Sequence, residues 1–231
     1  MKKRFPSKRG VALLLTFLFM FAFSFAASAA DCELKLSDAE GCAGIRTNLT
    51  LSVGNNPGIS NGILFIRYDP ELLSVDGEDI SLGEVGAKFE ITEKVCRQGV
   101  VTLGFVNRGN VTDDGILFVL PFTVALNAYP TKTKIDIEVK ELVGADGRPV
   151  EVNNLSAEFD ISEPPPYTLG DVNGDGEADI ADAMLVLYHA AKKEQLSNVS
   201  LLAANINKDR TVDIEDAMRL LYFVANKSPT L

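Results

Sequence analysis

Oxygen-bearing side chains recur at alternate positions in a short stretch near the carboxyl end. Positions 1, 3, 5, 6, 9 and 12 of this twelve-residue loop are Asp171, Asn173, Asp175, Gly176, Asp179 and Asp182. Calcium takes six to eight oxygen ligands, and alternate residues of a tight loop can direct theirs inward. Glu177 at position 7 would offer its backbone carbonyl, and Gly176 permits the positive φ of a sharp turn. The spacing predicts an EF-hand-like calcium site, with an acidic surface turn as the alternative.

A second stretch repeats the first with an offset of 34 residues. Residues 205–225 match residues 171–191 at 10 of 21 positions. Its candidate ligands are Asn205, Asn207, Asp209, Thr211, Asp213 and Asp216. Asn205 replaces an acid at position 1, and Arg210 replaces glycine at position 6, where we expect a left-handed backbone that costs roughly 1–2 kcal/mol. The sequence therefore predicts that the second loop binds Ca²⁺ more weakly than the first.

A largely apolar helical segment follows each loop, over residues 183–191 and 217–225. At helical spacing the inner face of the first segment is Ala183, Val186, Leu187 and Ala190. The residues left outside are Met184, Leu185 and Tyr188, with Met218, Arg219 and Tyr222 in the second copy. A domain of about 60 residues has too little core to bury both faces, so this surface suggests a partner. The alternative is that the helices bury it against each other or against the preceding domain.

Residues 49–161 show the pattern of a β domain. Short runs rich in Val, Ile, Phe and Thr alternate with turn signals, which is typical of a β-sandwich or barrel. The expected strands are 49–53, 63–68, 88–92, 100–106, 116–124 and 134–139. The run 134–139 alternates and predicts one buried face, whereas 116–124 is apolar on both faces and suits an inner strand. Pro121 within it implies an edge or a bulge, because proline donates no ladder hydrogen bond.

Composition divides the chain into four parts. Residues 1–30 carry a basic start, an apolar run from Val11 to Ala26 and the small residues Ala27 to Ala30, the layout of a signal peptide. The apolar run is about 16 residues, short of the roughly 20 that a retained anchor needs. A lipoprotein is a second alternative, although Asp31 precedes Cys32. We expect a β domain at 31–161, a Pro-rich linker at 162–168 and a calcium-binding domain at 169–231.

Charge and cysteine content narrow the function classes. The chain has 22 basic and 32 acidic residues, a net charge of −10, and removal of residues 1–30 takes away five basic residues. Such a chain repels polyphosphate, which argues against nucleic acid as a partner. Cys32, Cys42 and Cys96 allow three disulfide pairings in an exported protein, and sequence does not choose among them. The single histidine, His189, is far from them, which argues against a catalytic thiol.

The duplicated loop and helix resemble a dockerin module of cellulosome-type assemblies. The preceding domain is similar to a cohesin, the partner class of dockerins, in residues 56–73 and 110–124. The resemblance implies a jelly-roll β-sandwich that binds a dockerin across one sheet face, followed by a small α domain of two calcium loop–helix repeats. It also implies that no reaction is catalysed.

The resemblance further implies which residues of the α domain contact a cohesin. They are Ile180, Ala181, Met184, Leu185 and Tyr188 in the first copy and Ile214, Glu215, Met218, Arg219 and Tyr222 in the second. Loop positions 10 and 11 are Ile–Ala and Ile–Glu, where type I dockerins often have hydroxylated pairs. The likeness of the copies raises a dual orientation, and the differences Leu185/Arg219 and Ala181/Glu215 leave it open.

Three functions compete. The leading hypothesis is a secreted, non-catalytic adaptor scaffoldin, attached to a cell surface only through a partner. Its cohesin would receive a dockerin-bearing protein such as a polysaccharide-degrading enzyme, and its dockerin would enter another scaffoldin's cohesin. The alternatives are a carbohydrate-binding β-sandwich, disfavoured because the chain has no Trp for sugar stacking, and a secreted hydrolase, for which no nucleophile elbow, zinc motif or phosphate loop is present.

Overall fold

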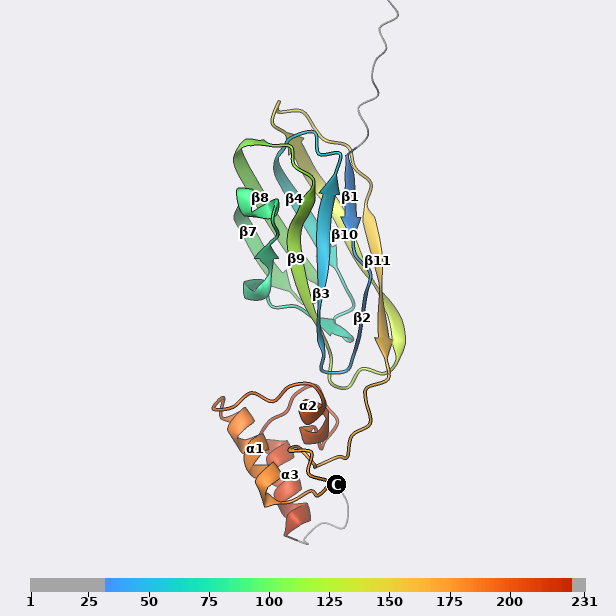
Figure 1. The fold of residues 1–231 in the computed structure, drawn as a ribbon, viewed down its shortest axis with the longest axis vertical. Helices are drawn as coiled ribbons and strands as arrows, with labels where there is room; N and C mark the ends of the chain where they lie inside the picture. The colour runs from blue at the N-terminus through green and yellow to red at the C-terminus, as the bar shows by residue number, and fades with distance from the viewer. Residues whose placement is uncertain (1–31, 226–231) are drawn as a thin grey trace, which may run out of the picture.

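The computed structural model describes residues 32–225 and shows a β-sandwich followed by a small helical domain (Figure 1). The expected signal peptide, and the last residues of the expected calcium-binding domain, lie outside this range. The strands are β1 (Glu33–Leu36), β2 (Ala39–Cys42), β3 (Arg46–Gly54), β4 (Ile59–Arg67), β5 (Leu73–Ser74), β6 (Ser81–Leu82), β7 (Glu90–Arg97), β8 (Val100–Val111), β9 (Gly115–Val124), β10 (Thr131–Gly144) and β11 (Leu155–Ser162). The α-helices are α1 (Ile180–Ala190), α2 (Val199–Ala204) and α3 (Ile214–Val224). The expected fold class is confirmed.

Two sheets pack face to face in the sandwich. The five-stranded sheet has the order β1-β3-β9-β5, with β6 also paired to β9, and the six-stranded sheet has the order β2-β11-β10-β4-β8-β7. The amino-terminal segment changes sheets, since β1 pairs with β3 in the first and β2 pairs in parallel with β11 in the second. This crossing ties the two sheets together along one edge.

Alternation of side chains explains how the strands fill the core. In β10, Ile135 and Ile137 are fully buried while Lys134 and Asp136 face solvent, as the sequence pattern predicts. Edge-to-face aromatic pairs continue the core across both sheets. Phe105 of β8 stands 5.2 Å from Phe118 of β9 and 5.3 Å from Phe89, measured between ring centroids.

Strand β9 is an inner strand, as expected from its apolar residues on both faces. It pairs with β3 along its length, and on its other side with β6 at Phe118 and Val119 and with β5 at Thr123 and Val124. Pro121 falls between these two short pairings, so among residues 32–225 no strand needs a hydrogen bond from it on that side. The short 3-10 turn Gly86–Lys88 packs so closely on β9 that a β-carbon at Gly86 would lie 1.8 Å from the Leu117 carbonyl oxygen.

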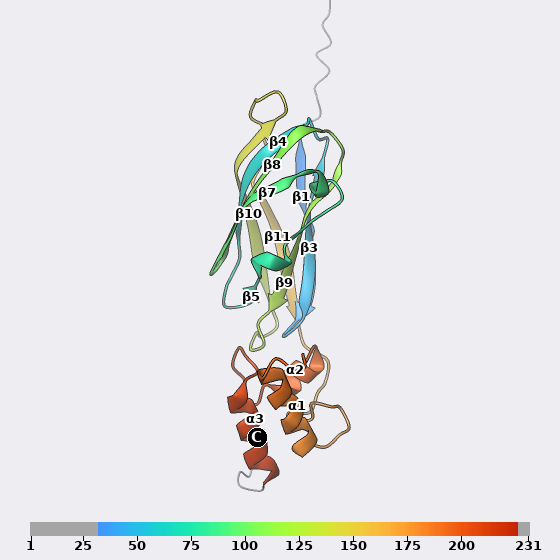
Figure 2. The same ribbon diagram turned by 90° about the vertical axis from the view of Figure 1, so that its left-hand side faces the viewer.

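The helical domain has a separate core and lies at one end of the sandwich (Figure 2). Ala183 and Val186 of α1 meet Ala217 and Leu220 of α3, and all four are fully buried. The α2 helix, which the sequence analysis did not predict, adds Ala203 and Ala204 to the same cluster. Within the described range, none of the helices has the length and apolarity needed to cross a membrane.

Candidate functional site

The first loop folds its side-chain oxygens onto its own backbone amides. The Asp171 carboxylate accepts hydrogen bonds from the N–H groups of Gly174 (2.8 Å) and Gly176 (3.0 Å). Asn173 Oδ1 accepts one from the Asp175 N–H at 2.8 Å. Both glycines have positive φ, +76° and +97°, which a side chain would strain. The oxygens of positions 1, 3 and 5 are therefore held on the inner side of one turn.

Asp182 joins this loop to the helix that follows it. Its carboxylate is fully buried and accepts three backbone hydrogen bonds, from Val172 (2.8 Å), Asn173 (2.9 Å) and Asp179 (2.9 Å). Asp179 in turn caps α1 by accepting from the Ala181 N–H at 2.7 Å, so the pair forms a capping box. Position 12 of the loop is thus also the third residue of the helix.

The pKa values of exposed and buried carboxyl groups in the two loops shift in opposite directions. The Glu177 backbone N–H and then the Asn173 amide donate to Asp175 and hold the pKa of its carboxyl below the usual value. In the second loop the Thr211 backbone N–H does the same for the pKa of Asp209. Burial raises the pKa of Asp216, the counterpart of Asp182.

The donor set of the first loop fits calcium. Among residues 32–225, no three carboxylate, thiolate or imidazole groups lie close enough to form a metal site by themselves. The loop, however, also offers the Asn173 amide oxygen and the Glu177 backbone carbonyl. Its donors are therefore all oxygen atoms, carried by short side chains or by the backbone. Hard cations such as Ca²⁺ prefer such donors. If the ion binds, it would supply the charge that lets these acidic groups remain close together.

The second loop keeps the pattern with less net negative charge. Asn205 is buried, and it accepts from the Asp209 N–H at 3.1 Å while its own amide donates to the Asp209 carbonyl at 2.8 Å. Asp216 accepts from the Asn207 N–H (3.1 Å) and the Asp213 N–H (2.9 Å). Residues 171–182 contain five acids and no base, whereas residues 205–216 contain four acids and two bases.

The expected strain at Arg210 is wrong. Arg210 is not among the described non-glycine residues with positive φ, and the left-handed residue of this loop is Lys208, at φ 58°. Lys208 corresponds to Gly174, at position 4, so the second loop makes its left-handed turn there instead. The Arg210 side chain leaves the loop altogether and contacts the β domain.

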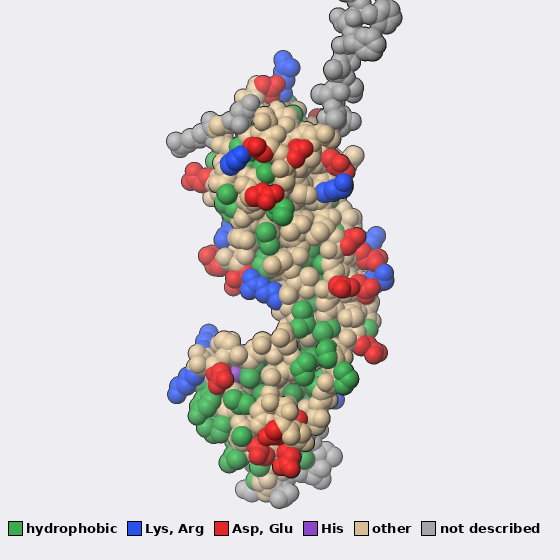
Figure 3. Space-filling model, in the orientation of Figure 1, with side chains coloured by type: hydrophobic (Ala, Val, Ile, Leu, Met, Phe, Trp, Pro, Cys, Tyr) green, Lys and Arg blue, Asp and Glu red, His purple; other side chains and the backbone are tan. Residues whose placement is uncertain are grey.

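An apolar stripe runs along the exposed faces of α1 and α3. Every fourth residue is large and apolar: Ile180 (62% exposed), Met184 (39%) and Tyr188 (39%) in α1, and Ile214 (63%), Met218 (43%) and Tyr222 (50%) in α3. Hydrophobic side chains gather over this domain in Figure 3. The other four of the ten predicted contact positions are small, charged or half-buried. Ala181 is exposed, Glu215 and Arg219 form an exposed ion pair at 2.7 Å, and Leu185 is half-buried against the helical core.

Comparison with known proteins identifies the helical domain. Residues 169–224 match the family profile described as the dockerin type I domain. The C-terminal domain is a type I dockerin. Dockerins of this type are generally calcium-binding, in agreement with the donor set of the loops. A comparison with curated protein sequences gives no match.

The β-sandwich has the cohesin fold. A chain of a type I cohesin–dockerin complex from Clostridium thermocellum matches 57% of this chain and 99% of its own length, with a TM-score of 0.51 and 17% identity. A non-cellulosomal cohesin from Archaeoglobus fulgidus covers 58% and 93%, with a TM-score of 0.52 and 19% identity. The sixth cohesin of scaffoldin B from Acetivibrio cellulolyticus, solved with the Cel5 dockerin, covers 57% and 99%, with a TM-score of 0.50 and 18% identity. Each match covers more than half of this chain, whereas the dockerin profile covers only residues 169–224, so the matches include the β-sandwich.

The sequence analysis missed an apolar depression on the cohesin-fold domain. It lies on the outer face of the six-stranded sheet, over β4, β7 and β8. Strand register places Phe65, Thr102 and Val95 in one row across these three strands. The lining residues are Ile63, Phe65, Arg67, Glu93, Val95, Arg97, Gln98, Val100 and Thr102. Apolar residues on both faces of 63–66 were the only sequence signal for it.

Basic side chains border this depression. Lys140 Nζ lies 5.1 Å and Arg67 Cζ 5.9 Å from the centroid of the Phe65 ring. Both also pair with Glu138, Arg67 at 3.2 Å, and these hydrogen bonds hold the pKa of Glu138 below its usual value. The face therefore combines an apolar centre with a charged rim, an arrangement that protein interfaces share.

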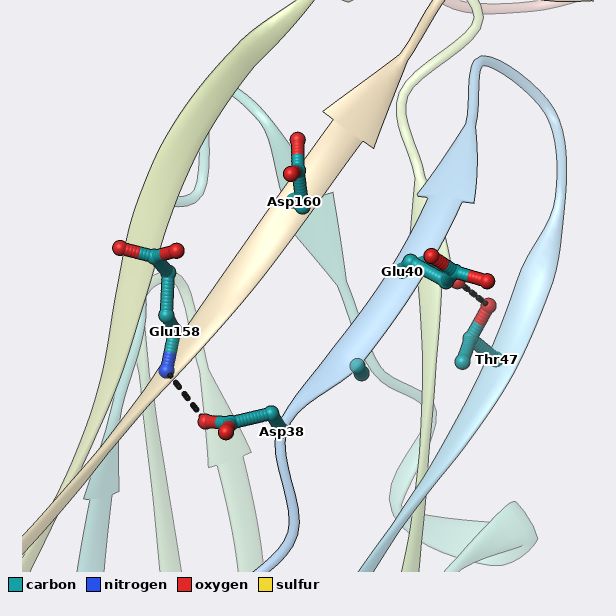
Figure 4. Close-up of a pocket in the computed structure, with 6 residues that line it drawn as sticks. Asp38, Glu40, Thr47, Glu158 and Asp160 are labelled. Carbon is teal, nitrogen blue, oxygen red and sulfur yellow. Dashed lines mark hydrogen bonds between the residues drawn. The ribbon is translucent and has the colours of Figure 1, made fainter.

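A second hollow, acidic in character, lies on the edge formed by β2 and β11 (Figure 4). Its carboxylates belong to Asp38, just before β2, to Glu40 of β2, and to Glu158 and Asp160 of β11 (Figure 4). Asp38 accepts from the Glu158 N–H at 3.1 Å, and Lys132 pairs with Glu158 and Asp160. None of the described residues that line this hollow is aromatic, so it has no ring on which a sugar could stack.

The three cysteines all lie in the described range, and none of them forms a disulfide. Cys42 is buried, Cys32 is half-buried and Cys96 is exposed. Burial raises the pKa of each thiol, which keeps these groups in the unreactive protonated form at neutral pH.

Proposed function

We propose that this protein is a secreted, non-catalytic adaptor with two recognition surfaces. The outer face of the six-stranded sheet, around Phe65, binds the dockerin of another protein, such as a polysaccharide-degrading enzyme. The apolar stripe of α1 and α3 binds a cohesin of a scaffoldin. The observation that carries the proposal is the presence, on one chain, of a type I dockerin with an uncovered apolar stripe and of a cohesin-fold domain with an uncovered apolar depression.

The stripe has the composition of a recognition surface. Six large apolar side chains remain exposed on a domain of fewer than 60 described residues, more than a small soluble domain leaves uncovered without a partner. They follow helical spacing, so each helix presents them along one side. The first copy is apolar throughout, whereas the second includes the Glu215–Arg219 ion pair. The two helices therefore present different surfaces to a cohesin.

Calcium supports the second surface in this proposal. In the first loop the proposed ligands are the side chains of Asp171, Asn173, Asp175, Asp179 and Asp182 and the carbonyl of Glu177. Because Asp182 also completes the capping box of α1, order in the loop fixes the start of the helix that carries Met184 and Tyr188. The second loop binds more weakly, since it has lost a carboxylate at position 1 and gained two basic residues.

Export is the part of the proposal that rests on sequence alone. Residues 1–30 have the charge and apolar pattern of a signal peptide, and calcium at millimolar levels outside cells would keep the loops filled. Attachment to a cell surface then occurs only through the scaffoldin that receives the dockerin.

An affinity capture with matched variants tests the proposal. The immobilised protein is exposed to the secretome of its source organism, with Ca²⁺ or with a chelator, and captured proteins are identified by mass spectrometry. We expect dockerin-bearing enzymes and a cohesin-bearing scaffoldin. Phe65→Ala should remove the enzymes only, and the Tyr188→Ala/Tyr222→Ala pair should remove the scaffoldin only.

Exposed tyrosines elsewhere provide the controls. Tyr129→Ala, in the β9–β10 connection, and Tyr167→Ala, in the linker, remove aromatic side chains of similar exposure outside both surfaces. They should change neither capture. Truncation of a central interface aromatic costs about 2 kcal/mol or more, so each specific loss should be roughly thirtyfold in affinity. If a secretome containing dockerin proteins yields none, the adaptor proposal is wrong, and polysaccharide pull-downs would test the carbohydrate alternative.

A further inference from the structure

Arg210 connects the two domains. It occupies position 6 of the second calcium loop, but its guanidinium extends to the segment that follows β4. There it donates to the Pro70 carbonyl at 3.3 Å and to the Glu71 carbonyl at 2.8 Å, and it pairs with the Glu71 carboxylate. A planar guanidinium is suited to several acceptors at once. The second loop is therefore bonded to the cohesin-fold domain through three acceptors on two consecutive residues.

Apolar contact accompanies this bond at the same end of the sandwich. Leu126, in the connection between β9 and β10, packs against the apolar core of the dockerin. Leu202 of α2 approaches the turn between β2 and β3, where a β-carbon at Gly44 would be 3.9 Å from its Cδ2 and 2.9 Å from Leu126 Cδ2. The domains thus meet through three separate β-domain segments, which limits their relative rotation.

The linker favours this contact. Residues 163–168 include three consecutive prolines, and such segments are stiff and extended. An exposed ion pair contributes little between separate molecules. Here the short connection holds the partners at high effective concentration, so a modest contact suffices to remain closed.

We propose that the end of the cohesin-fold domain is a docking surface for the protein's own dockerin, held by Arg210 and Leu126, and that the two domains move as one body. This interdomain contact uses neither the apolar stripe, whose large side chains stay exposed, nor the depression around Phe65, which stays open to solvent in the intact chain. Both recognition surfaces are then held at a fixed relative orientation. The dockerin is also kept from reaching the cohesin-type face of its own chain.

NMR relaxation of the purified protein in Ca²⁺ tests the proposal. Amide relaxation gives a rotational correlation time for each domain separately. We expect one common value for both domains in the unchanged protein. In the Arg210→Ala/Leu126→Ala variant the dockerin should tumble faster than the β-sandwich, with a correlation time shorter by roughly a third or more, since a small domain released from its contact reorients partly on its own. Glu71→Gln, made in the other domain, should give a smaller change in the same direction.

Arg148→Ala is the matched control. It removes an exposed arginine whose partner, Asp146, lies within the same domain, so domain tumbling should stay unchanged. Retained amide chemical shifts in each domain show that a variant is folded. Two different correlation times in the unchanged protein, or no change in the Arg210→Ala/Leu126→Ala variant, would overturn the proposal. Binding to an isolated cohesin is measured in parallel, because loss of binding with common tumbling would count against the adaptor function and not against the interdomain contact.

Discussion

Asp182→Asn should destabilise the dockerin far more than its conservative chemistry suggests. The Asp182 carboxylate is fully buried, and its two oxygens accept N–H groups from Val172, Asn173 and Asp179. Asparagine has one acceptor oxygen and one donor group. The oxygen can retain the two amides that bond to Oδ1, but the NH₂ then faces the Asp179 N–H, and a donor meets a donor.

The magnitude follows from these bonds. One charge-assisted hydrogen bond is lost outright, which costs about 1.5–3 kcal/mol, and the partly buried Asp179 N–H is left unsatisfied. The remaining two bonds lose their charge. One of the proposed calcium ligands also becomes neutral. We expect the free energy of unfolding of the dockerin to fall by about 3–5 kcal/mol in the presence of Ca²⁺.

Asp175→Asn is the matched comparison in the same loop. Asp175 is exposed, and an asparagine oxygen can still accept from the Glu177 N–H, so we expect a much smaller loss of stability than in Asp182→Asn. The assay is urea denaturation followed by circular dichroism at the helical band in saturating Ca²⁺. Equal losses in the two variants would refute the assignment of Asp182 as the residue that joins loop and helix.

Three further outcomes are expected. Asn205→Asp restores a carboxylate at position 1 of the second loop and should raise its calcium affinity roughly tenfold in calorimetric titration; an unchanged second site would contradict the charge argument. Chelation of calcium should abolish most of the helical signal and leave the strand signal intact, because the loops but not the sandwich depend on the metal; parallel loss of both signals would argue against separate cores. Gly86→Ala should lower the free energy of unfolding by more than about 4 kcal/mol in thermal melting, because the new β-carbon would meet the Leu117 carbonyl. Gly147→Ala, which has free space but a φ of +77°, should lower it by about 1–2 kcal/mol. Similar values for the two variants would show that the backbone at Gly86 shifts easily.

Local patterns predicted the parts of the structure that depend on local bonds. The loop side chains bond to amides two to five residues away, as Asp171 does to Gly174 and Gly176, so their spacing alone defines the turn. Strands with regular alternation, such as β10, were predicted for the same reason. The α2 helix was missed because it is six residues long and has no side-chain cap; it depends on burial of Leu202, Ala203 and Ala204.

Features that join distant segments could not be predicted. The depression on the sheet requires Phe65, Thr102 and Val95 to share a row, which only the register of three strands decides. The sequence analysis predicted only that Arg210 would strain its own loop. It missed the contact with the β domain, because the partners Pro70 and Glu71 are about 140 residues away in the chain. Long-range contacts of this kind leave no mark in local composition.

The position of β11 determines how mechanical load would enter the sandwich. It is the last strand, and the linker to the dockerin leaves directly from its end at Ser162. β11 is bonded on one side to β10 and on the other, in parallel, to β2. Ladder hydrogen bonds lie across the strand axis. Tension between a bound enzyme and an anchored scaffoldin would pull β11 along its length, so that the bonds on both sides share the force in shear instead of opening one by one from an end.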